Sequence, residues 1–76
     1  MKELLETIAR ALVDYPDEVT VNEVEGENII ILELRVAKED MGKVIGKQGR
    51  IAKAIRSVMK AAAIKENVKV AVEIVQ

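Results

Sequence analysis

The spacing of apolar residues alternates between helical and strand periods along the chain, and this order constrains the fold more than any other feature. Residues 2–14 carry apolar side chains three or four positions apart, which predicts a helix with one apolar face. Alternating segments at 18–25 and 29–36, separated by a glycine-containing turn at 25–28, predict two strands. Val24 breaks the alternation of the first, which predicts a bulge there.

The second half of the chain contains two segments with helical spacing and one with strand spacing. Residues 38–45 and 50–65 have helical patterns, and residues 68–75 alternate as a strand. The inner stripe of the longer helix is predicted to be Ile51, Ile55, Val58, Met59 and Ala62. Because 76 residues leave room for one domain, the prediction is a single α+β domain over residues 1–76. Its order is α-β-β-α-α-β, with a three-stranded sheet and helices on one face.

The net charge of −1 hides an uneven distribution of cations and acids. Met41–Lys65 contains no Asp or Glu, so all thirteen acids lie elsewhere. The cations of this block are Lys43, Lys47, Arg50, Lys53, Arg56, Lys60 and Lys65. Phosphate binding depends on where cations are placed rather than on their total, so the block favours a nucleic-acid partner. A solvated helix face is the alternative, since runs of charge commonly do no more than that.

The four residues Gly46-Lys47-Gln48-Gly49 separate the two later helices. Gly46 is expected to take a positive φ that ends the first of them, and Gly49 to allow a sharp turn into the next. The following helix offers unpaired N–H groups, and Lys47 and Arg50 add full charges. The arrangement therefore fits a sugar-phosphate chain, although a simple helix-loop-helix corner would also contain glycine.

Other functional classes fit the sequence poorly. The P-loop and the dinucleotide-binding glycine patterns both fail on spacing. The chain has no Cys and no His, and Ser57 has no evident base, so we predict neither catalysis nor a metal or other cofactor. Tyr15 is the single aromatic residue, which excludes recognition by an aromatic stacking platform. No apolar run is long enough to span a bilayer, and the acidic start does not resemble a signal peptide, so a cytoplasmic protein without membrane contact is expected.

The sequence VIGKQG before a basic helix resembles the V-I-G-x-x-G signature of KH domains. With the predicted element order, the whole chain resembles the small stand-alone bacterial KH proteins of the KhpA type, which have the type II KH fold. The resemblance implies binding of single-stranded RNA, with single-stranded DNA as a further option, in a role such as RNA chaperone or post-transcriptional regulator. It also implies a homodimer, or a heterodimer with a larger Jag-like KH protein.

Carried onto this sequence, the resemblance assigns the phosphate clamp to Gly46, Lys47, Gln48 and Gly49. Bases would lie over an aliphatic groove bordered by the two helices and the second strand, with a footprint of about four nucleotides. The groove residues would be Val36, Val44, Ile45, Ile51 and Ile55, and the nearby cations Lys43, Arg50 and Lys53. Core packing is the competing explanation for each of the aliphatic residues.

A protein-interaction or dimerisation module with little RNA affinity is the alternative function. Ala54, Ala61 and Ile64 fall on a side of the longer helix away from its inner stripe. Ile29 and Ile31 fall on the strand face opposite Leu32. These apolar positions suggest a contact between copies, which is compatible with RNA binding, whereas isolated exposed aliphatic residues are also normal on monomers.

Overall fold

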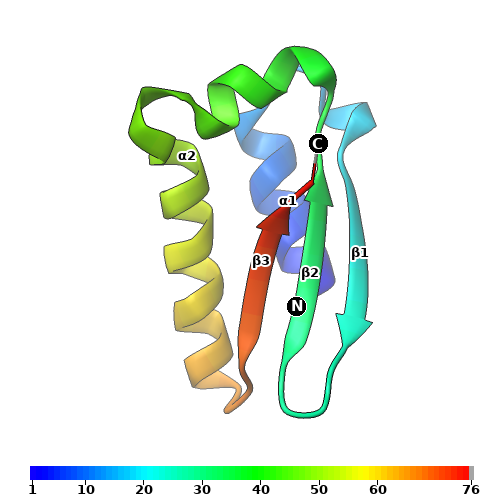
Figure 1. The fold of residues 1–76 in the computed structure, drawn as a ribbon, viewed down its shortest axis with the longest axis vertical. Helices are drawn as coiled ribbons and strands as arrows, with labels where there is room; N and C mark the ends of the chain where they lie inside the picture. Colours follow the sequence, from blue (N-terminus) through cyan, green and yellow to red (C-terminus); the bar gives the residue numbers. More distant parts are fainter. Residues whose placement is uncertain (76) are drawn as a thin grey trace.

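Three strands form one sheet, and α1 lies behind it in a computed structural model that describes residues 1–75 (Figure 1). The elements are α1 Lys2–Leu12, a 3-10 turn Pro16–Glu18, β1 Thr20–Glu25, β2 Ile30–Arg35, α2 Lys38–Lys65 and β3 Val70–Ile74. The predicted α+β class is confirmed. The two later helices occur as two parts of α2, on either side of a kink at residues 46–49. Gln76, the last residue of the predicted domain, lies outside the described residues.

The sheet has the strand order β1-β2-β3, with β1 antiparallel and β3 parallel to the central strand β2. The parallel pair requires a crossover connection, which α2 provides. The predicted bulge is wrong, because the β1–β2 register is regular from Thr20 opposite Arg35 to Glu25 opposite Ile30. Val24 instead pairs with Ile31, which is opposite Ala71 on β3, so these three residues form an apolar row across the sheet.

The core lies between the sheet and the two helices. Its buried residues come from all of α1, β1, β2 and α2, and they are Leu5, Ala9, Val19, Val21, Leu32, Leu34, Ile55 and Met59. The predicted inner stripe of residues 50–65 is wrong at Val58, which is 46% exposed, whereas Ala52 and Ala63 are buried. The spacing of Ala52, Ile55, Met59 and Ala63 follows one helical face, and that face, rather than the one through Val58, meets the sheet.

Asp40 ties the first part of α2 to the end of α1. Its side chain is fully buried, and its two carboxylate oxygens accept the backbone N–H groups of Asp14 and Tyr15, each at 3.0 Å. A buried carboxylate is stable only when hydrogen bonds satisfy it. Asp40 therefore fixes the helical turn that leads into residues 46–49.

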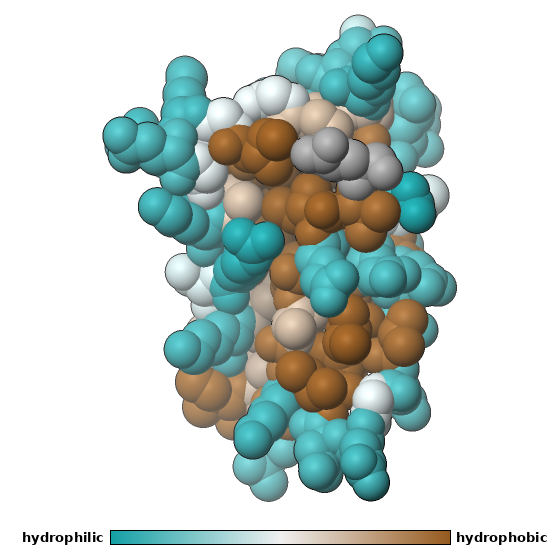
Figure 2. Space-filling model, viewed as in Figure 1, coloured by the Kyte–Doolittle hydropathy of each residue, from teal (hydrophilic) through white to brown (hydrophobic). Residues whose placement is uncertain are grey.

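The face of the sheet away from α1 is open to solvent. In the orientation of Figure 1, Figure 2 shows apolar side chains along the middle of this face and hydrophilic groups at its margins. Val24 and Ile29 are 41% and 39% exposed. The acids Glu33 and Glu73 lie opposite each other on β2 and β3, so the apolar area is interrupted by negative charge.

Candidate nucleic-acid interface

Residues 46–49 form a left-handed loop within α2. Lys47, Gln48 and Gly49 all have positive φ, at 51°, 62° and 70°. Gly46 has φ −74° and ψ 178°, so the prediction that it takes a positive φ is wrong. The left-handed backbone falls on Lys47 and Gln48 instead, where it costs roughly 1–2 kcal/mol per residue. Strained backbone of this kind persists where the surrounding structure enforces it and is concentrated at functional sites.

A hollow of about 300 Å³ opens beside this loop. Its lining residues are Gly42, Lys43, Gly46, Lys47, Arg50 and Ile51. The structure therefore brings together five of the residues that the sequence analysis selected, from both parts of α2. The three cationic side chains make the hollow attractive to an anion.

The cations of the hollow differ in how far they are neutralised. The Nζ of Lys43 lies 3.3 Å from Oδ1 of Asp14, an exposed ion pair. Within residues 1–75, no carboxylate lies within ion-pair distance of Lys47 or Arg50. Lys47 and Arg50 thus remain available to a phosphate, while Lys43 is already shared with Asp14.

The remaining predicted site residues differ in how exposed their side chains are. Lys53 and Gln48 are exposed, Gly49 and Val36 are half-buried, and Ile45 is 45% exposed. Val44 and Ile55 are 0% and 1% exposed, so their assignment to a base-binding groove is wrong. Both side chains fill the interior between α2 and its neighbours and leave no surface for a base.

The strand that borders the second part of α2 is β3, not the second strand as predicted. α2 packs along β3, and the Nε of Arg56 donates to the carbonyl oxygen of Val72 at 3.4 Å. Sequence reasoning missed this strand, although the β-α-β rule gave the signal. Two parallel strands joined by a helix normally lie near each other with the helix packed on the sheet.

A groove of about 430 Å³ runs between α2 and β3. Its lining residues are Arg56, Met59, Lys60, Ala63, Ile64, Val68, Lys69, Val70, Ala71 and Val72. Aliphatic side chains form most of its surface, and Arg56, Lys60 and Lys69 supply cations. None of the five residues predicted to form the aliphatic groove lines it, so this groove differs from the one expected from the sequence.

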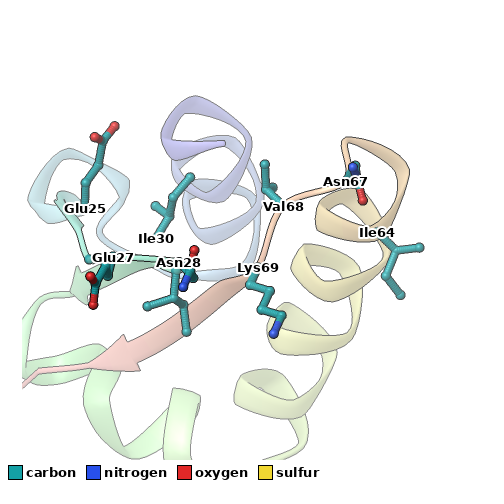
Figure 3. A pocket seen from close by; sticks show the side chains of 10 residues that line it. Glu25, Glu27, Asn28, Ile30, Ile64, Asn67, Val68 and Lys69 are labelled. Atoms are coloured by element: carbon teal, nitrogen blue, oxygen red, sulfur yellow. The ribbon is translucent and has the colours of Figure 1, made fainter.

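Figure 3 shows a larger hollow, of about 690 Å³, at the β1–β2 turn, which lies at the opposite end of the molecule from residues 46–49 (Figure 1). It is formed where the β1–β2 turn meets the connection from α2 to β3, and Glu25, Glu27, Asn28 and Lys69 are among its polar residues. Its two carboxylates would repel a phosphate. Size alone therefore does not identify the nucleic-acid site.

The described part of the chain, residues 1–75, offers no group of three or more acidic, His or Cys side chains that could hold a metal ion. Nor does any helix in this range have the length and apolar character to cross a membrane.

Comparison of the chain with known proteins identifies a family model and relatives that match almost its whole length. The family model described as "KhpA/KhpB, KH domain" matches residues 2–74. A protein named RNA-binding protein KhpA from Clostridium acetobutylicum is 76% identical over 75 residues, which are 99% of this chain and 100% of the relative. A protein of the same name from Chlamydia trachomatis is 54% identical over 76 residues, covering 100% of this chain and 97% of the relative.

The fold also occurs within a larger protein of known structure. The chain superimposes on Era from Aquifex aeolicus, bound to GDP and aluminium fluoride, with a TM-score of 0.67 and 21% identity. The match covers 96% of this chain and 28% of the Era chain. At this identity the likeness concerns the fold alone.

Proposed function

The chain belongs to the KhpA/KhpB family of KH-domain proteins, and from this premise we propose that it binds single-stranded RNA without catalysing a reaction. The names of its full-length relatives, RNA-binding protein KhpA, support an RNA partner. We further propose that residues 1–76 form one KH domain that acts in the cytoplasm as an RNA chaperone or post-transcriptional regulator.

The observation that carries this proposal is the left-handed loop with its free cations. Three consecutive residues with positive φ turn the backbone at Lys47–Gly49, directly before the second part of α2. Successive backbone N–H groups in such turns, together with a helix N-terminus, favour bound anions. With Lys47 and Arg50 beside them, Gly46–Gly49 would hold the phosphates of one strand.

The bases would then lie along the groove between α2 and β3. Aliphatic side chains of this groove would cover the unstacked bases, and the edge of β3 would offer backbone groups to their polar edges. Ile45 before the loop and Ile51 and Lys53 after it are the other residues proposed to contact the RNA. A footprint of about four nucleotides fits a KH domain, and single-stranded DNA would differ only by the missing 2′-hydroxyl group.

Salt dependence tests the proposal. If roughly two to four phosphates are neutralised, log K for a single-stranded RNA should fall against log[salt] with a slope of about −1.4 to −2.8. Fluorescence anisotropy with a labelled random-sequence RNA of about eight nucleotides, twice the footprint, measures this slope. The alternative, a protein-interaction module, requires no measurable RNA affinity even at low salt, and that result would reject RNA binding.

We also propose that the protein self-associates, or pairs with a larger Jag-like KH protein, through one side of α2. Ala54, Val58, Ala61 and Ile64 lie along the outside of this helix, and all four are exposed. Ile64 is 70% exposed and Val58 is 46% exposed. We call these four residues the outer apolar side. Two associated copies of the protein could bind the same long RNA together, which would raise the overall affinity without any new kind of contact to the RNA.

Variants on the outer apolar side are expected to produce monomers. Ala61→Arg or Val58→Glu would place a charge within the proposed contact, where an unpaired buried charge is strongly unfavourable. Neither residue lines the groove between α2 and β3. Light scattering should then show a change from dimer to monomer. Affinity for the short RNA should persist, and affinity for a longer RNA should fall.

Ala11→Arg is the matched control for Ala61→Arg, because Ala11 is also an exposed alanine in a helix but lies on α1. It is expected to leave the dimer intact. A parent protein that is already monomeric at micromolar concentration would reject self-association. Dissociation by Ala11→Arg alone would move the contact to α1.

A further inference from the structure

Gly42 is a glycine that the fold does not require. It lies in the helical part of α2 before the loop, where its backbone does not have the positive φ that favours glycine. A Cβ atom built on Gly42 would meet no heavy atom within 4 Å. Glycine in a helix is less stable than alanine, so this position lowers stability without any gain in packing or backbone geometry.

The surroundings of Gly42 indicate what the missing side chain leaves room for. Gly42 lines the hollow beside the loop together with Lys43, Lys47 and Arg50. Gly46 lines it too, and a Cβ atom there would likewise meet nothing within 4 Å. The hollow thus combines two stretches of bare backbone with three cationic side chains.

We propose that Gly42 is a contact residue for the RNA backbone, so that the bound strand extends from the loop onto the preceding helical turn. The inference rests on the proposed function and adds to the site a residue that was not predicted from the sequence. A sugar-phosphate group would lie directly against the Cα of Gly42, where any side chain would hold it away from the surrounding cations. Bare glycine also lets protein helices approach each other, but the free cations Lys47 and Arg50 favour a polyanion.

The test measures stability and RNA affinity in the same variants. Gly42→Ala should raise the unfolding midpoint by about 4–8 °C, because the helix gains alanine and no contact is lost. The same variant should bind the random-sequence RNA of about eight nucleotides several-fold more weakly. Gly42→Gln, with a longer neutral side chain in the same open space, should bind at least about tenfold more weakly, since it fills the hollow.

Ser57→Ala is the matched control, because it places alanine at an exposed position of the same helix outside the hollow. It should leave RNA affinity unchanged. If Gly42→Ala and Gly42→Gln bind RNA as the parent does, the role of Gly42 is rejected, while the parent's own binding continues to support the proposed function. If these variants change only the association state in light scattering, the bare surface serves a protein contact and the inference is likewise rejected.

Discussion

Replacing Lys47 and Gln48 together by aspartate is expected to reduce affinity for single-stranded RNA by at least about hundredfold while the fold persists. Both side chains are exposed, so little packing is lost. Each unit charge changed about 6 Å from a phosphate is worth on the order of 1–3 kcal/mol at the dielectric of a protein surface. Two new carboxylates would therefore repel the phosphates that the loop is proposed to hold. Anisotropy titration with the short RNA measures the loss.

Lys65→Asp with Asn67→Asp is the matched control for this double variant. It changes the net charge by the same amount at the other end of α2, and both positions are exposed. Asn67 already has positive φ, which aspartate tolerates better than most residues. This control should keep most of the RNA affinity. Equal losses in the two double variants would mean that total charge, and not the loop, determines binding.

The second large effect is expected at Asp40, and it concerns stability. Asp40→Ala removes the acceptor of two backbone N–H groups, those of Asp14 and Tyr15. Each hydrogen bond to a charged group contributes about 1.5–3 kcal/mol, so the free energy of unfolding should fall by about 3–6 kcal/mol. A domain of this size has only about 4–11 kcal/mol in total. Urea unfolding followed by circular dichroism measures the change.

Glu39→Ala provides the comparison for Asp40→Ala. Glu39 precedes Asp40 in the same helical turn but is exposed, and its loss should cost less than about 1 kcal/mol. If the two variants unfold at the same urea concentration, the hydrogen bonds of Asp40 do not hold α2 to the end of α1. At temperatures low enough for the Asp40→Ala variant to remain folded, it should bind RNA as the parent protein does.

The spacing of apolar residues predicted the fold because each helix and strand buries one face, and the residues of that face recur at the period of the element. The alternation through Leu32 and Leu34 and the helical spacing through Leu5 and Ala9 both mark residues that are buried in the core. The predictions that went wrong depend on contacts between elements. Val24 breaks the alternation because it pairs with Ile31 on the outer face of the sheet, and the sequence of one strand does not contain that pairing.

The sequence predicts the charged residues of the candidate site, because they are close together along the chain. It does not predict which aliphatic residues are exposed enough to contact a base. The loop cations follow directly from the sequence, and the structure places Lys43, Lys47 and Arg50 around one hollow. Val44 and Ile55 cannot be told from groove residues by type, because both functions need aliphatic side chains. The role of Asp40 does not follow from the sequence, because its hydrogen-bond partners lie 25 and 26 residues away, beyond any local pattern.

Amide NMR can locate the bound RNA, which we propose lies at Gly46–Gly49 and along the groove between α2 and β3. Titration of the ¹⁵N-labelled protein with the random-sequence RNA of about eight nucleotides reports which backbone groups change environment. RNA binding at these sites should produce the largest shifts at Gly42 and at residues 46–51, with smaller shifts along β3. Shifts confined to Ala54, Val58 and Ala61 or to the outer face of the sheet, or no shifts at all at low salt, would contradict this placement of the RNA.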